Sequence, residues 1–424
     1  MRYLVFKIGI LLLCFFFLQK GRAFSLEYQF GAQLYERFYI ENNYFDSFTG
    51  KFDRDETTNI VTVYPDFYLS SGKKIGLYLL ADASWIHSWN TDESDEIIVE
   101  LENAYASMTR NKTSVYLGLQ TFQVGRGFIM ESDEPGITLK TNWPGRFYSS
   151  FQAARIIDTS PLLSILIGYK IGFLENFNIF GTWFNDTDNS FADMLNNQDQ
   201  ALWGLDQTAV ESEGDFFYMG TSGEFFIKDV YVSGIFILER GNGTLVLEYP
   251  YTAIDFNLSS YLLDIDFGYN LTDRFSAGSF LFVSGGGQNP GKREINAFIS
   301  PMPYNPRTAI FFNSRFNDQK RWDSLSKEGI RWAGVIAPGV TIDAQLMENF
   351  NSELTLAAFF PEKKPSDSQN WYGWEADIFL TYMIRNRHKL FFEAALFQHG
   401  DFYKANGQKP DPTTKFLLGI HTFF

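Results

Sequence analysis

Charged side chains of both signs gather between residues 126 and 155, and their spacing suggests an action on passing solutes. The basic members are Arg126, Lys140, Arg146 and Arg155, and the acidic members are Glu131, Asp133 and Glu134. Opposite fixed charges across a narrow aqueous passage create a transverse field that orders polar solutes and selects them by charge. We therefore predict a charged pore constriction. The alternative is that these residues are solvated charges on loops and turns.

A second set of polar residues alternates with aliphatic residues along predicted strands. Its members are Gln120, Asp264, Asp266, Glu375 and Asp377. Carboxylates at such positions would be costly in the core of a β-sandwich, but they suit a strand that turns one face to a water-filled lumen. We therefore expect these residues to line a lumen.

Other reactive residue types do not form a recognisable site. The four histidines are scattered, and no serine–histidine pair is indicated. The single cysteine, Cys14, lies in an apolar leader segment, so disulfides, zinc–thiolate sites and cysteine nucleophiles are excluded beyond it. The oxygen-rich loop 185–190, with Asp193 beyond it, leaves calcium binding and an ordinary solvated loop both open, because it lacks the glycine and glutamate of an EF-hand loop. We expect no enzymatic activity and no cofactor.

The first 23 residues have the layout of an export signal. Arg2 and Lys7 precede an apolar run at residues 8–18, and Gly21-Arg22-Ala23 has the small-x-small pattern of a cleavage site. We predict a signal peptide at 1–23 and one domain at 24–424. The chain has a net charge of −15, and the signal holds four basic residues and no acid, so the remainder carries −19. That balance argues against nucleic-acid binding.

The element that must position these side chains is a β-strand. Residues 26–40 alternate apolar and polar side chains with a period of two, broken only at Glu36, and similar patterns recur near residues 75–85, 263–270 and 375–382. No apolar run of 18 residues follows the signal, although aromatic residues make up 18% of the chain. Two classes fit, a secreted β protein such as a sandwich or solenoid, and an outer-membrane β-barrel, which the alternation favours.

Connections of alternating length predict the strand number. Eight short turns centre near residues 72, 111, 144, 175, 228, 273, 349 and 386, and nine outer connections, most of them long and polar, lie between them. They predict a transmembrane antiparallel barrel of about 18 strands with both termini in the periplasm. Sixteen strands is the alternative, because residues 285–339 are hard to divide. The last strand, ending at Phe424, resembles the terminal signal by which such barrels are recognised for insertion.

One stretch also resembles a known family. In residues 114–144, Gly118 and Gln120 lie on a strand that ends in Gly125-Arg126-Gly127 before an acidic loop. This pattern resembles porins of the alginate-export type. The resemblance implies a passive conduit whose basic lumen favours an anionic polysaccharide, although the predicted lumen acids depart from a uniformly basic bore.

Together these observations predict an outer-membrane porin for passive passage of hydrophilic solutes, which include anionic sugars or polysaccharide. We expect Arg126, with Lys140 and Arg155, to bias the bore toward anions, because the third outer loop can fold into the lumen. The expected partners are outer-membrane lipid, the barrel-insertion machinery and the solute, and a monomer and a trimer both stay open. The alternative function is an adhesin-like surface protein whose long loops bind a partner.

Overall fold

The computed structural model describes most of the chain beyond the predicted signal peptide. The described residues are 26–46, 51–71, 74–89, 95–156, 159–172, 175–187, 189, 192, 209–247, 251–289, 292–300, 307–312, 333–364, 370–385, 387–404 and 409–424. The predicted signal at 1–23 lies outside them. No helix among these residues is long and apolar enough to cross a membrane.

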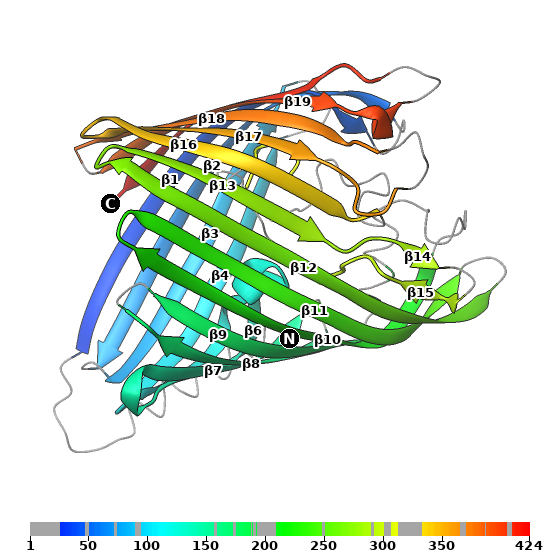
Figure 1. Cartoon of the computed structure of the whole chain (residues 1–424). Helices are drawn as coiled ribbons and strands as arrows, with labels where there is room; N and C mark the ends of the chain where they lie inside the picture. Colours follow the sequence, from blue (N-terminus) through cyan, green and yellow to red (C-terminus); the bar gives the residue numbers. More distant parts are fainter. Residues whose placement is uncertain are drawn as a thin grey trace.

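One antiparallel sheet closes on itself as a barrel (Figure 1). It contains 18 long strands and two short ones, and β1 pairs with β20 to close the ring. The long strands are β1 (Leu26–Asp46), β2 (Lys51–Ser71), β3 (Ile75–Ser88), β4 (Glu96–Arg110), β5 (Thr113–Val124), β6 (Met130–Asn142), β7 (Phe147–Ile156), β8 (Ser160–Lys170), β9 (Asn176–Asp186), β10 (Ala209–Ile227), β11 (Val230–Leu247), β12 (Thr252–Thr272), β13 (Phe275–Ser284), β16 (Val335–Met347), β17 (Phe350–Phe359), β18 (Gly373–Ile384), β19 (His388–His399) and β20 (Thr413–Phe423). The short strands are β14 (Gln288–Asn289) and β15 (Glu294–Ile295). The predicted barrel of about 18 strands is confirmed.

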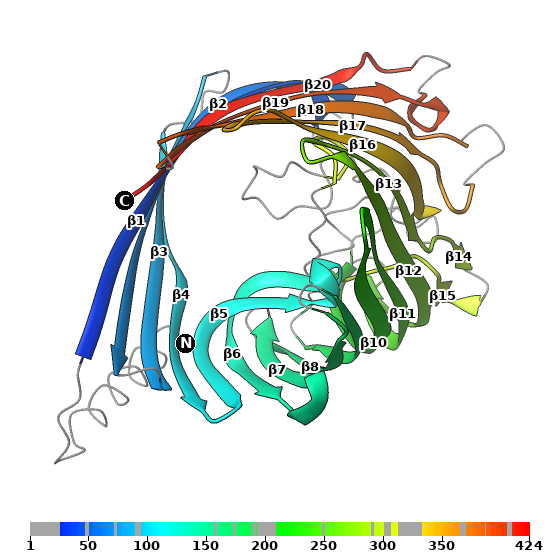
Figure 2. The same ribbon diagram turned by 60° about the vertical axis from the view of Figure 1, so that its left-hand side comes forward.

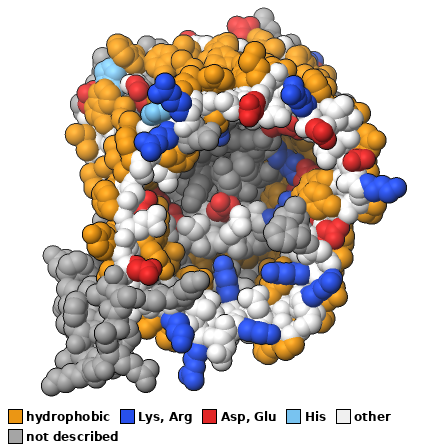
Figure 3. All heavy atoms as spheres, turned by 90° about the vertical axis from the view of Figure 1, so that its left-hand side faces the viewer, with side chains coloured by type: hydrophobic (Ala, Val, Ile, Leu, Met, Phe, Trp, Pro, Cys, Tyr) orange, Lys and Arg blue, Asp and Glu red, His pale blue; other side chains and the backbone are white. Residues whose placement is uncertain are grey.

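The two faces of the wall differ as the alternation predicts. On β12, Ile265 and Phe267 are exposed on the outer face, whereas Asp264 is buried and Asp266 is half-buried on the inner face. Successive strand residues point to opposite sides, so this parity assigns each side chain to the outer or the inner face of the barrel. Figure 3 views the end that carries the short turns: hydrophobic side chains cover much of the outside, and charged side chains surround a hollow mouth.

The eight predicted short turns all coincide with strand connections at one end of the barrel. Several outer connections, however, are shorter than expected because their flanking strands continue. One of these flanking strands is β6, which has thirteen residues and begins at Met130. Residues 307–312, within the stretch 285–339 that is hard to divide from the sequence, form bends and turns.

The hairpin of β5 and β6 leaves the wall halfway along its length. β5 pairs with β4 only as far as Leu119, and β6 pairs with β7 only from Gly136. The two strands continue to pair with each other up to Val124 and Met130. Residues 120–135, which we call the inward hairpin, therefore lie inside the ring of strands, as Figure 2 shows for its turn.

The hydrophobic core lies inside the barrel rather than between layers. Met130 and Ile129 of the inward hairpin are fully buried in one cluster with Phe311 and Phe312, which belong to the long connection before β16. Phe311 stacks on Phe359 of the wall with ring centroids 4.0 Å apart. Burial of these aromatic rings holds residues 307–312, which we call the inward segment, against the inner wall.

Candidate pore constriction

The turn of the inward hairpin is built by glycine on both sides of an arginine. Gly125, Arg126 and Gly127 all have left-handed backbone, with φ of 59°, 57° and 91°. Glycine adopts this conformation without steric cost, whereas Arg126 is strained by about 1–2 kcal/mol. A Cβ atom on Gly125 would also lie 3.3 Å from Ile237 of β11. Both glycines therefore let the turn pack on the opposing wall and present Arg126 to the lumen.

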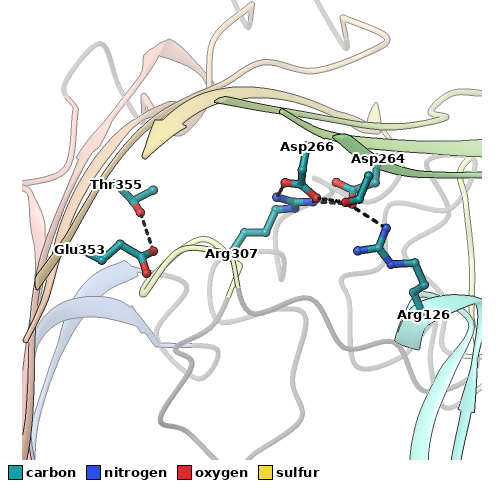
Figure 4. A network of polar contacts seen from close by, with 7 residues as sticks. Arg126, Asp264, Asp266, Arg307, Glu353 and Thr355 are labelled. Atoms are coloured by element: carbon teal, nitrogen blue, oxygen red, sulfur yellow. Dashed lines mark hydrogen bonds and ion pairs between the residues drawn. The ribbon is translucent and has the colours of Figure 1, made fainter. Parts of the chain in front are cut away.

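Arg126 reaches the polar groups of that wall. Its Nη1 donates to Oγ of Ser233 on β11 over 3.4 Å, and Ser233 in turn donates to Asp266 on β12 over 3.1 Å. Figure 4 shows Arg126 entering this network from the hairpin side. One hydroxyl therefore links the hairpin to a carboxylate far away in the sequence.

Arg307 enters the same network from the inward segment. Its Nη1 donates to Asp266 over 2.6 Å and its Nη2 over 2.9 Å, and it also forms an ion pair with Asp264. The guanidinium carbon lies 4.9 Å from the ring centre of Phe280, a cation–π distance. Burial by itself lowers the pKa of Arg307, but its hydrogen bonds and ion pairs with the two carboxylates outweigh this and raise it, so Arg307 stays charged. We call Arg126, Ser233, Asp264, Asp266 and Arg307 the eyelet network.

The predicted acids on β18 hold the inward segment from the other side. The fully buried carboxylate of Glu375 accepts hydrogen bonds from the hydroxyl of Thr308 over 3.0 Å and from the amides of Ile310 and Phe311 over 2.6 and 2.9 Å. The amide of Ala309 donates to Asp377 over 3.4 Å. These acids thus lie on the lumen side, and they bind backbone there rather than facing open water.

The other predicted site residues divide into three groups. Gln120 is buried at the base of the inward hairpin, where it donates to the carbonyl of Gly136 over 3.1 Å. Glu131 and Asp133 lie on the hairpin face opposite that of Met130, and Glu134 accepts a hydrogen bond from Ser132 over 3.1 Å. Lys140 and Arg155 fall outside the hairpin.

Lys140 and Arg155 lie on opposite faces of the wall. Lys140 is on the inner face of β6, with its ammonium 5.7 Å from the ring centre of Tyr116. Arg155 pairs with Pro161 and shares the outer face with exposed Leu163 and Ile165. The structure therefore does not bring Arg155 together with Arg126, because Arg155 occupies the other parity position of its strand.

Two members of the eyelet network were missed from the sequence. Arg307 lies in a long connection with several other basic residues, and no local pattern distinguishes it from them. Ser233 has the inward parity of its strand, but many small hydroxyl residues share that property. Their roles come from pairing with residues between 33 and 107 positions away.

The oxygen-rich loop near Asp186 is described only in part, and residues 188, 190 and 193 lie outside the described residues. Asp186 is buried and accepts a hydrogen bond from the hydroxyl of Ser212. Within the described ranges, no group of three or more His, Cys, Asp or Glu side chains could hold a metal ion.

The barrel is similar to solved outer-membrane porins of low sequence identity. OccAB4 of Acinetobacter baumannii is 9% identical over 95% of this chain and 99% of its own, with a TM-score of 0.56. OprD of Pseudomonas aeruginosa is 11% identical over 96% and 95%, with a TM-score of 0.54. OpdK of P. aeruginosa, solved with vanillate, is 10% identical over 93% and 98%, with a TM-score of 0.53.

No family model matches the chain, and no curated protein matches it. The structural likeness shows that the chain has the 18-strand fold of outer-membrane porins. The resemblance to alginate-export porins gains no support from these comparisons, in which the similar structures are porins of the OprD and Occ type.

Proposed function

We propose that the chain is a porin of the bacterial outer membrane, through which small hydrophilic solutes diffuse passively. The observation that carries the proposal is the eyelet network, in which two inward-folded pieces of chain meet on the inner wall at Asp264 and Asp266. Such pieces narrow a lumen that would otherwise be wide in a barrel of 18 strands. Charged groups at a narrowing act strongly on permeating solutes.

The proposed selectivity depends on four charges in the network. Arg126 and Arg307 are positive, and Asp264 and Asp266 are negative, so their formal sum is zero. We also propose that Arg126 and Lys140 make the bore more permeable to anions. Arg155 should contribute less to this selectivity, because it lies on the outer face. A more specific version of the proposal is passage of anionic sugars or polysaccharide. The formal charge of the eyelet network is zero, so the network by itself does not favour anionic solutes over neutral ones.

The test is the conductance of the refolded protein in a planar lipid bilayer. Stepwise, ohmic conductance with a reversal potential that changes on replacing Arg126, Lys140 and Arg155 together by Ala supports the proposal. Unchanged conductance and selectivity would mean that the constriction lies elsewhere in the bore. A refolded barrel without conductance would favour the alternative of a surface protein that binds a partner through its loops.

The proposed targeting follows from the export signal at 1–23. We propose that the signal is removed and that the barrel-insertion machinery then receives the mature chain through its last strand, β20. Alternating outer-face side chains on β20, such as Phe416 and Leu418, support a strand that meets lipid on one side.

A further inference from the structure

A cavity of about 610 Å³ opens in the lumen wall at the end that carries the short turns. Inner-face side chains of β12, β13, β16, β17, β18 and β19 line it. It lies apart from the eyelet network, none of whose residues belongs to its lining. Its size is within the range of about 300–1,000 Å³ that is usual for small-molecule sites.

Uncharged polar groups form one row across this cavity. Gln345 pairs with Asn351, and Asn351 pairs with Thr381, so two amides and a hydroxyl lie side by side on β16, β17 and β18. Adjacent strands are about 4.8 Å apart, which spaces these groups regularly along the row. Amides and hydroxyls can each donate and accept hydrogen bonds.

A second row lies two residues further along the same strands. Asp343 pairs with Glu353, and Glu353 pairs with Phe379, so this row offers two carboxylates and the edge of an aromatic ring. Asp343 accepts a hydrogen bond from Ser276 over 3.2 Å, and Glu353 accepts one from Thr355 over 3.3 Å. Together the two rows offer polar groups that could form hydrogen bonds with several hydroxyls of one solute at the same time.

The charges at the cavity disfavour an anion. Asp343 and Glu353 lie within the rows, and Lys389 and Arg274 are the basic residues of the lining, with Asp273 beside Arg274 in the turn. The acids therefore outnumber the basic groups, and a carboxylate solute would have to approach two carboxylates. A solute with hydroxyls and no charge meets no such penalty.

We propose that this cavity is a subsite for an uncharged, polyhydroxylated solute, a monosaccharide or short oligosaccharide. The inference rests on the proposed porin function and names a solute class for it. Asn270 and Thr272 of the cavity lining lie on β12 between Asp266 and the short turn to β13, so a solute that passes the eyelet network toward that end meets the cavity next. Binding there is weak, because conduction requires that a solute also leaves.

The test uses maltose as the probe of the full mature chain. In planar bilayers, millimolar maltose is expected to interrupt the potassium current reversibly, whereas glucuronate and vanillate at equal concentration interrupt it less. The double variant Asn351→Ala/Thr381→Val removes one amide and one hydroxyl and should weaken maltose blockage about tenfold, a loss of two hydrogen bonds of the usual net strength. The matched control Thr109→Val/Asn142→Ala removes the same groups from β4 and β6, outside the cavity, and should stay within about twofold.

Saturation-transfer NMR on detergent-solubilised protein separates this inference from the porin function. Maltose signals that weaken in the double variant and persist in the control support the subsite even if the barrel does not conduct. Equal maltose binding by both double variants, or stronger binding of glucuronate or vanillate than of maltose, would overturn it. If the protein binds maltose but does not conduct ions in the bilayer, only the porin function is overturned.

Discussion

Replacing Arg307 by Ala should make the bore more selective for cations. Arg307 contributes one of the two positive charges of the eyelet network, and it contacts both Asp264 and Asp266. Its removal changes the formal sum of the network from zero to minus one. The remaining positive group, Arg126, donates to Ser233 over 3.4 Å and contacts neither carboxylate of the network through a hydrogen bond among the described residues.

The size of the effect follows from Coulomb's law. One unit charge at about 5 Å from a permeating ion changes its energy by about 0.8 kcal/mol at the dielectric constant of water, and by more in a partly dehydrated passage. That energy favours a cation about fourfold and disfavours an anion about fourfold, so the ratio of cation to anion permeability should rise about sixteenfold. The inward segment also loses its anchor on β12, so we expect the single-channel conductance to rise as well.

The assay is the reversal potential of single channels across a gradient of potassium chloride at about 0.1 M, where charges are screened over about 10 Å. Arg155→Ala is the matched control, because it removes the same charge from the outer face. The double variant Asp264→Asn/Asp266→Asn should shift the reversal potential in the opposite direction. The reasoning is refuted if Arg307→Ala leaves the reversal potential at the value of Arg155→Ala, or moves it toward anion selectivity.

Three further predictions concern the wall, the inward segment and export. Leu79→Arg, on the outer face of β3, should destabilise the barrel by about 2–4 kcal/mol near the membrane midplane, whereas Asp82→Asn on the inner face should cost little; equal losses in reversible unfolding would show that the face assignment is wrong. Phe311→Ala should cost about 3–5 kcal/mol and raise the conductance, because its ring stacks on Phe359 at 4.0 Å; a stable variant with unchanged conductance would mean that this packing does not hold the segment. N-terminal sequencing of membrane-extracted protein should begin at Phe24, and a chain that retains Met1 would contradict the signal at 1–23.

The barrel itself could be predicted from local patterns. Side chains alternate between the two faces of a strand, so apolar residues such as Leu77 and Ile265 mark the outer face wherever polar residues occupy the positions between them. Eight short turns and nine outer connections separate these strands, and the two numbers together give the strand count. Both signals are contained in a few neighbouring residues, and long-range contacts do not change them. Asp264, Asp266, Glu375 and Asp377 could be assigned to the inner face for the same reason.

The proposed constriction depends on contacts that no local pattern contains. The inward hairpin leaves the wall because its apolar face packs on β11 and because Gly125 and Gly127 allow a turn that fits there. Arg307 becomes part of the eyelet network only because burial of Phe311 and Phe312 and the hydrogen bonds to Glu375 bring its segment into the lumen. Arg155 was predicted to line the pore, but it lies on the outer face. A shift of one residue along β7 is enough to exchange the inner face for the outer face. Alternation determined the wall from sequence alone, whereas the filling of the lumen was decided by packing between residues up to 107 positions apart, which only the tertiary structure brings together.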